Sequence, residues 1–189
     1  MDKIFGSYAL QGITGRSRTL LLVGLALLFV MARLPMAEAN RVFHNELLPL
    51  GIISFELAFY PAVSQLMLDS WNAAQKAAVL RHTAFDFLYL LAYGGLISLL
   101  CENVARSFRH EVPVKTGALL SWSALFAAAL DAVENLGILV IFEHAAGTPW
   151  PQLVALLAGL KFLLIIPALL YLVLLAPFSI GRRLARRRS

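Results

Sequence analysis

We predict an all-α, polytopic membrane protein with four transmembrane helices and one short amphipathic helix on the outer face. Three observations predict it: hydrophobic residues make up 60% of the 189 residues, charged residues make up 14%, and the mean hydropathy is +0.76. A soluble domain usually carries about a quarter charged residues. The chain is therefore expected to be integral to a membrane, and we treat residues 1–189 as one domain.

Four apolar stretches provide the spans, at about 19–36, 83–104, 117–142 and 150–178. The last three match the roughly 20 residues that a bilayer requires. The first is shorter, and Ala37-Glu38-Ala39 follows it as in a cleavable signal peptide. About 18 residues precede this apolar run, which is long for the basic segment of a signal peptide. We therefore prefer an uncleaved span.

The outer segment 37–82 contains the short helix. Apolar residues recur there at helical spacing, opposite three polar ones: Phe59, Val63, Leu66, Met67 and Trp71 against Ser64, Gln65 and Asp69. With Pro61 suited to the first turn, the pattern favours a helix that lies in the interface or packs on the spans. Asn72 followed by Gln75 resembles a capping box, so the next helix should begin there and continue into the second span.

Basic residues set the expected topology. The tail 179–189 holds five arginines, the N-terminal segment and the loop after the second span hold three basic residues each, and the loop 143–151 holds none. We therefore expect both termini in the cytoplasm, with the tail contacting membrane lipids. No nucleic-acid partner is expected, because no folded reader domain accompanies the basic tail.

Polar residues inside the spans are the candidates for function. Asp131, Glu134 and Asn135 of the third span are spaced i, i+3 and i+4, so they share one helix face. The second span carries four residues on one face and the fourth span carries one charge: His82, Asp86, Tyr89 and Tyr93, and Lys161. From the helical rise, Asp131 lies near the middle of the membrane and the others nearer the outside. This depth predicts a polar pocket that is open to the outer side.

The charges in this set do not balance. A lysine paired with Glu134, with Asn135 bridging helices, would be a purely structural arrangement. Three acids at membrane depth, however, face one lysine, so at least one acid must be protonated, hydrated or otherwise paired. We therefore predict a functional pocket with Glu134 or Asp131 as candidate catalytic acid or base. The predicted ligand-binding residues are Asp86, Asn135, Lys161, Glu56, Tyr89, Tyr93 and His82.

No metal ion or cofactor is predicted. His82 and Asp86, at i and i+4, could place two ligands on one face beside Glu56 or Glu46. No HExxH motif or cysteine cluster supports that alternative, however, and no histidine lies in mid-membrane to bind haem. The single cysteine, Cys101, excludes an intramolecular disulfide.

Two motifs carry a resemblance to a known group of proteins. One is Ser54-Phe55-Glu56-Leu57-Ala58, followed by Phe85-Asp86-Phe87-Leu88-Tyr89 and Tyr93-Gly94; the other is Asp131-Ala-Val-Glu134-Asn135, followed by a lysine in the last span. Together they resemble a family of small bacterial four-span integral membrane proteins of uncharacterised function, over most of residues 54–165. The resemblance implies the bacterial inner membrane. It also implies that five residues belong together: Glu56, Asp86, Glu134, Asn135 and Lys161.

Three functions fit these features. The first is a pocket that binds or acts on a lipid or another hydrophobic small molecule, with a polar floor beneath an aromatic rim. The rim would comprise Phe55, Phe59, Tyr60, Phe85, Tyr89, Tyr93 and Trp150. The second is transport of protons or small cations by a homo-oligomer, although Glu102, the one acid toward the cytoplasm, is expected in the headgroups. The third is an accessory role, with the amphipathic helix docking on a partner membrane subunit. Whether the protein is an enzyme is left open.

Overall fold

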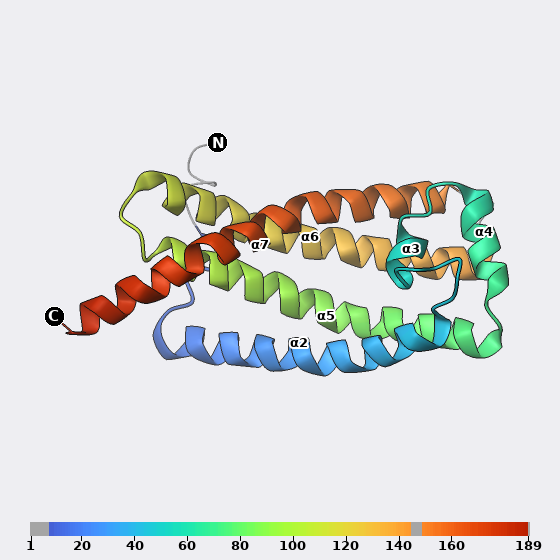
Figure 1. The fold of residues 1–189 in the computed structure, drawn as a ribbon, viewed down its shortest axis with the longest axis horizontal. Coiled ribbons are helices and arrows are strands. Elements are labelled where there is room, and N and C mark those ends of the chain that lie inside the picture. The colour runs from blue at the N-terminus through green and yellow to red at the C-terminus, as the bar shows by residue number, and fades with distance from the viewer. Residues whose placement is uncertain (1–7, 145–148, 189) are drawn as a thin grey trace.

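The computed structural model describes residues 8–144 and 149–188, with side chains described as far as Arg182. Four long helices lie side by side (Figure 1): α2 (Gly15–Phe43), α5 (Ala73–Ala105), α6 (Glu111–His144) and α7 (Trp150–Arg188). Two short helices, α3 (Ile52–Glu56) and α4 (Pro61–Ser70), cover one end of the bundle, which we call the α3–α4 end. The start of α2 and the end of α7 lie at the other end, the terminal end. The all-α fold is confirmed, and the described residues contain no strand.

The four long helices are each long and apolar enough to cross a membrane. Each predicted span falls within one of them, and every helix extends beyond its span. The protein is therefore membrane-embedded. The first helix, α2, continues without a break through Ala37-Glu38-Ala39, the tripeptide that resembles a cleavage site, and Ala39 is buried.

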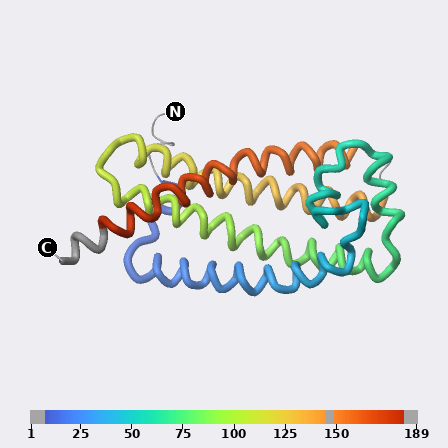
Figure 2. Tube along the Cα trace, in the orientation of Figure 1, coloured from blue at the N-terminus to red at the C-terminus, as the bar shows by residue number. Residues whose placement is uncertain are grey.

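The long helices pack in chain order. α2 packs along α5, α5 along α6, and α6 along α7, with a smaller contact between α5 and α7. α2 and α7 make no comparable contact. The tube in Figure 2 shows the same order of the four long helices along the chain. In the most apolar window of each helix, 50% of the residues are buried in α5 but only 11% in α2. α5 and α6 therefore form the centre of the bundle, and α2 and α7 flank it.

Small residues bring the two central helices together. An added Cβ at Gly94 would lie 2.6 Å from the Cβ of Ala128, so α5 could not approach α6 this closely with a larger residue there. Ala124 and Ala127 are fully buried in the same contact region of α6. This close approach places Tyr93, next to Gly94, beside the polar face of α6.

The short helix α4 begins with Pro61 in its first turn, as predicted. Its orientation differs from the prediction, because Ser64 and Leu68 are buried whereas Leu66 is 57% exposed. Ser64 tolerates burial because its hydroxyl donates a hydrogen bond to the Ala58 carbonyl, at 2.9 Å. Helix α4 therefore packs on the bundle through Leu68 and Met67, while Val63 and Leu66 stay exposed, which suits a helix in the membrane interface.

The predicted capping box at the start of α5 is confirmed. The Asn72 side chain accepts a hydrogen bond from the Gln75 backbone N–H, and the Gln75 side chain accepts one from the Asn72 N–H, both at 3.0 Å. Because these bonds satisfy backbone donors at the first turn, the helix begins there and continues unbroken to Ala105.

Helix α3 is held at the α3–α4 end of the bundle by contacts with Asn40 and with Trp71. Gly51 precedes it with φ of 62°, and a side chain at this position would collide with Asn40. The Asn40 side-chain oxygen accepts a hydrogen bond from the Ile52 N–H at 3.2 Å. Phe55 is buried against Trp71, whose indole N–H donates to the Phe43 carbonyl at 2.8 Å. These contacts fix the position of Glu56, the last residue of α3.

Candidate ligand-binding site

Four carboxyl groups and one lysine meet inside the bundle toward the α3–α4 end. We call them the acidic cluster: Glu56, Asp86, Asp131, Glu134 and Lys161. They come from α3, α5, α6 and α7, and none of these residues is more than 7% exposed. The predicted polar faces of the second, third and fourth spans therefore converge, and α3 adds Glu56 to them.

Lys161 is the centre of the acidic cluster. Its Nζ donates hydrogen bonds to Asp131 Oδ1 at 2.8 Å and to Glu134 Oε1 at 3.0 Å. Glu56 Oε2 lies 3.5 Å from the same Nζ. An ammonium group has three protons to donate, so one lysine contacts three carboxyl groups and its donors are fully used.

Two neutral side chains extend the acidic cluster. The Tyr93 hydroxyl donates to Asp131 Oδ2 at 2.8 Å, and the Asn135 amide donates to Asp86 Oδ2 at 2.7 Å. Asn135 thus bridges α6 and α5, as expected for a purely structural arrangement. Its partner, however, is Asp86, a further carboxyl group. The i, i+3, i+4 spacing of the α6 residues lets one helix face serve both Lys161 and Asp86.

The charges remain unbalanced. The acidic cluster has four carboxyl groups and one ammonium, which contacts three of them. Charge inside a bilayer is costly unless it is compensated. Glu134 is fully buried, and its Oε2 accepts no hydrogen bond although it lies 2.9 Å from Lys161 Nζ. At Glu56, outside the spans, burial raises the pKa of the carboxyl above its ordinary value, against the opposing effect of Lys161. The acidic cluster is therefore suited to take up protons or a cationic group.

A cavity of about 480 Å³ opens beside the acidic cluster. Four of the five cluster residues line it, and Glu134 is the exception. The rest of the wall is largely apolar and includes Phe29, Leu96, Ile97, Phe162, Ile165 and Leu169. This size and this mixture of apolar walls with a few polar groups are typical of small-molecule sites. Of the two candidate catalytic acids, Asp131 reaches the cavity and Glu134 does not.

The first span supplies a wall of the cavity that the sequence analysis missed. Phe29, Arg33 and Met36 of α2 line it. The Phe29 ring lies 4.8 Å from the ring of Tyr89, which lies 5.5 Å from that of Tyr93, so three aromatic rings form a row. The sequence did contain an indication that these three residues act together, because residues 29, 33 and 36 have the i, i+4, i+7 spacing of a single helix face.

The expected aromatic rim is wrong in most of its members. Of the seven predicted rim residues, only Tyr89 and Tyr93 line the cavity. Phe55 is buried in the core, because adjacent residues of a helix point about 100° apart and Phe55 therefore turns away from Glu56. Phe59 and Tyr60 are exposed at 45% and 69%, with their rings against each other. The remaining two predicted members also lie away from the cavity: Phe85 and Trp150.

The histidine of the predicted site, His82, lines the cavity, and its ring meets Phe43 edge-on at 5.7 Å. Two other acids of the outer segment, Glu38 and Glu46, are exposed and do not line the cavity. Within residues 8–144 and 149–182, no group of three histidine, cysteine, aspartate or glutamate side chains is arranged to hold a metal ion.

A second buried polar site lies toward the terminal end, around Glu102. Glu102, which was expected at the depth of the headgroups, is fully buried within the protein near the end of α5. Its oxygens lie 2.9 Å from Arg18 Nη2 and 3.4 Å from Arg106 Nη2, and they accept hydrogen bonds from Ser121 and from the Leu10 N–H. We call these five residues the terminal cluster. Arg18 and Leu10 precede the expected first span, so sequence spacing gave no sign that they would contact Glu102.

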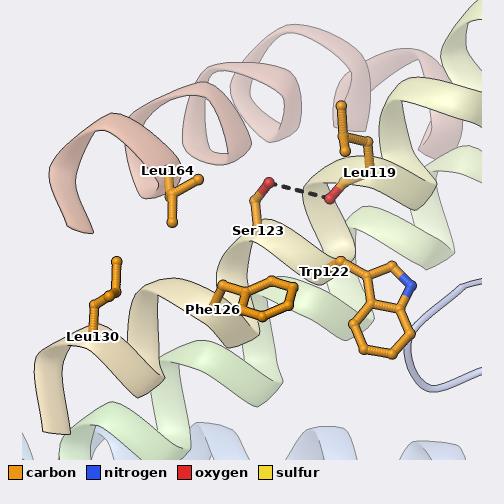
Figure 3. Close-up of a pocket in the computed structure, with 6 residues that line it drawn as sticks. All are labelled: Leu119, Trp122, Ser123, Phe126, Leu130 and Leu164. Atoms are coloured by element: carbon orange, nitrogen blue, oxygen red, sulfur yellow. Dashed lines mark hydrogen bonds between the residues drawn. The ribbon is translucent and has the colours of Figure 1, made fainter. Parts of the chain in front are cut away.

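A further hollow of about 310 Å³ lies on the outside of the bundle, between α6 and α7 (Figure 3). Its lining is almost entirely apolar and includes Phe126, which is 58% exposed. The polar atom of Ser123 is already used, because its hydroxyl donates to the Leu119 carbonyl at 3.2 Å. This groove is suited to an acyl chain of the bilayer, and it offers no group for chemistry.

No family model, curated protein or solved structure matches the chain. The resemblance to small bacterial four-span proteins therefore stays a prediction, and the geometry of the cavity is the basis for assigning a function.

Proposed function

We propose that the protein binds a lipid or another amphiphile in the cavity between α2 and α7. The observation that carries this proposal is that one cavity has both a charged floor, formed by the acidic cluster, and a long apolar wall. An amphiphile has the same two parts. We further propose that the protein lies in the bacterial inner membrane with both termini in the cytoplasm, following its basic residues and its family resemblance.

The packing of the helices supports this function. α2 rests on α5, and α7 rests mainly on α6, so no close contact joins α2 to α7 across the cavity. Phe29 comes from one side of this opening and Ile165 from the other. A ligand can therefore reach the cavity from the bilayer with its tail between the two flanking helices, while its polar part meets Asp86 and Asp131.

Transport is less well supported. Apolar side chains of α5, α6 and α7 pack together near the terminal end, beside the terminal cluster: Cys101, Val104, Leu120, Ala168 and Tyr171. A proton or cation route through the bundle needs polar groups along its length. The cavity is confined to one part of the bundle, which fits a binding site better than a pathway.

The proposal is tested by blocking the apolar half of the cavity without changing its charge. Ile97→Trp places a large ring in the cavity, whereas Leu100→Trp, on the same helix and 37% exposed, is the matched control. Each protein is purified in a mild detergent, and the bound lipid is counted by native mass spectrometry. We expect the unmodified chain and Leu100→Trp to retain one amphiphile, and Ile97→Trp to retain about tenfold less, a difference of about 1.4 kcal/mol.

Two outcomes would contradict the proposal. One is that the unmodified protein retains no lipid at all. The other is that Ile97→Trp and Leu100→Trp retain equal amounts while both remain folded, as judged by their thermal unfolding.

A further inference from the structure

The cavity contains an anionic part and a cationic part that do not pair with each other. Asp86 and Arg33 both line it, yet among the described residues Arg33 takes part in no ion pair. We propose that the ligand is a zwitterionic phospholipid whose head group carries a primary amine, with the amine at the acidic cluster and the phosphate at Arg33. This inference rests on the proposed function and names the class of amphiphile.

The acidic side of the cavity is suited to an amine with N–H donors. Asp86 receives one hydrogen bond, from Asn135 to its Oδ2, and its Oδ1 has no donor among the described residues. Asp131 and Glu56 also line the cavity, and Lys161 alone compensates them. A primary ammonium supplies both the missing positive charge and the missing donors.

A quaternary ammonium is a poorer match for this site. It has no N–H, so it cannot donate to the carboxyl oxygens, and proteins recognise it by enclosing it in aromatic rings. Phe29, Tyr89 and Tyr93 stand in a row along one wall of the cavity, which differs from an aromatic cage. The cavity should therefore discriminate ethanolamine-type from choline-type head groups.

The cationic side is formed by Arg33. Its guanidinium has five donors in a planar fork that matches phosphate oxygens, and it is exposed at the α2 edge of the cavity. The head group of an aminophospholipid places two methylene groups between its phosphate and its amine. Such a ligand would compensate Arg33 and Asp86 together while its acyl chains follow the apolar wall toward Leu169.

The experiment compares three phospholipids that have the same acyl chains and differ only in head group: phosphatidylethanolamine, phosphatidylcholine and phosphatidylglycerol. Delipidated protein in detergent is titrated with each lipid, and the bound fraction is measured by native mass spectrometry. We expect phosphatidylethanolamine to bind at least about tenfold more tightly than either of the others.

Two substitutions separate the two ends of the head group. Arg33→Gln should weaken phosphatidylethanolamine binding about tenfold while leaving the binding of dodecylamine, which has no phosphate, unchanged. Asp86→Asn should abolish the preference for phosphatidylethanolamine over phosphatidylglycerol. Arg41→Gln and Glu38→Gln, at exposed positions of the same helix that do not line the cavity, are the matched controls and should bind like the unmodified chain.

The possible failures are distinguishable. Equal binding of the three lipids, or a preference for phosphatidylglycerol, would overturn the aminophospholipid assignment and leave the proposed function standing. Absence of binding by any of the three lipids and by dodecylamine would overturn both. If Asp86→Asn does not fold, the ranking of lipids on the unmodified chain and the effect of Arg33→Gln still decide the assignment.

Discussion

The acidic cluster and the terminal cluster are both buried polar sites in a bundle of apolar helices, but they differ in charge balance. In the terminal cluster, one carboxylate, Glu102, meets two guanidinium groups, a hydroxyl and a backbone N–H. In the acidic cluster, three carboxyl groups contact one ammonium, that of Lys161, and the fourth, Asp86, accepts a hydrogen bond from the neutral Asn135. Only the acidic cluster faces the cavity of about 480 Å³.

The difference separates a structural site from a functional one. Every partner of Glu102 belongs to the chain, so the terminal cluster needs nothing further, and it ties residues 10 and 18 to α5 and α6. The acidic cluster leaves an excess of acid beside open space, since Glu56, Asp86 and Asp131 line the cavity with Lys161 as their one cation. Burial of a polar group is therefore weak evidence for function, whereas incomplete compensation next to a cavity is stronger evidence.

The largest expected effect comes from removing the only cation of the acidic cluster. Lys161→Met leaves three carboxyl groups without their shared partner, and breaking a buried ion pair typically costs about 3–5 kcal/mol. We expect the thermal unfolding temperature in detergent to fall steeply. Lys115→Met is the control, because Lys115 is 71% exposed in its ion pair with Glu111 and such exposed pairs contribute little to stability. Similar shifts for the two variants would contradict the central role of Lys161.

An intermediate effect is expected for Glu102→Gln in the terminal cluster. The neutral side chain keeps its shape but loses its charge-assisted bonds to Arg18 and Arg106, which should cost about 2 kcal/mol. Because this site is remote from the cavity, bound lipid should be unchanged when it is measured by native mass spectrometry. Loss of lipid from a folded Glu102→Gln protein would show that the two clusters are coupled and would break the comparison.

The smallest expected effect is a pH dependence of stability that comes from Glu56 of the acidic cluster. Because burial raises the pKa of Glu56, the folded protein binds a proton there at pH values where the unfolded chain has released it. The free energy of unfolding should therefore fall as the pH rises from the ordinary pKa of this carboxyl, 4.5, toward its raised pKa in the folded protein. Glu56→Gln removes this pH dependence. We expect the unfolding temperature of Glu56→Gln, relative to the unmodified chain, to increase as the pH rises above the ordinary pKa of 4.5. A relative decrease over this range would show that Lys161 outweighs burial at Glu56.

Much of the fold followed from local patterns. The apolar stretches, the Asn72 capping box and the turn at Pro61 each depend on residues within a few positions of one another, and the structure has all of them. The shared face of Asp131, Glu134 and Asn135 was predictable for the same reason, since helical periodicity alone decides it. The buried side of α4 was not, because burial of Ser64 depends on a bond to Ala58 outside the helix.

The sequence by itself determined that this chain forms four membrane-spanning helices and that acids outnumber lysines at membrane depth, because composition and helical spacing are properties of single segments. Only the tertiary structure decided that α2 lines the cavity, that Arg33 shares it with Asp86 without pairing, and that Glu102 is fully compensated. These facts depend on which helices become neighbours. Helix packing in a bilayer is set by close contacts such as that of Gly94 with Ala128, which the periodicity of one helix does not encode.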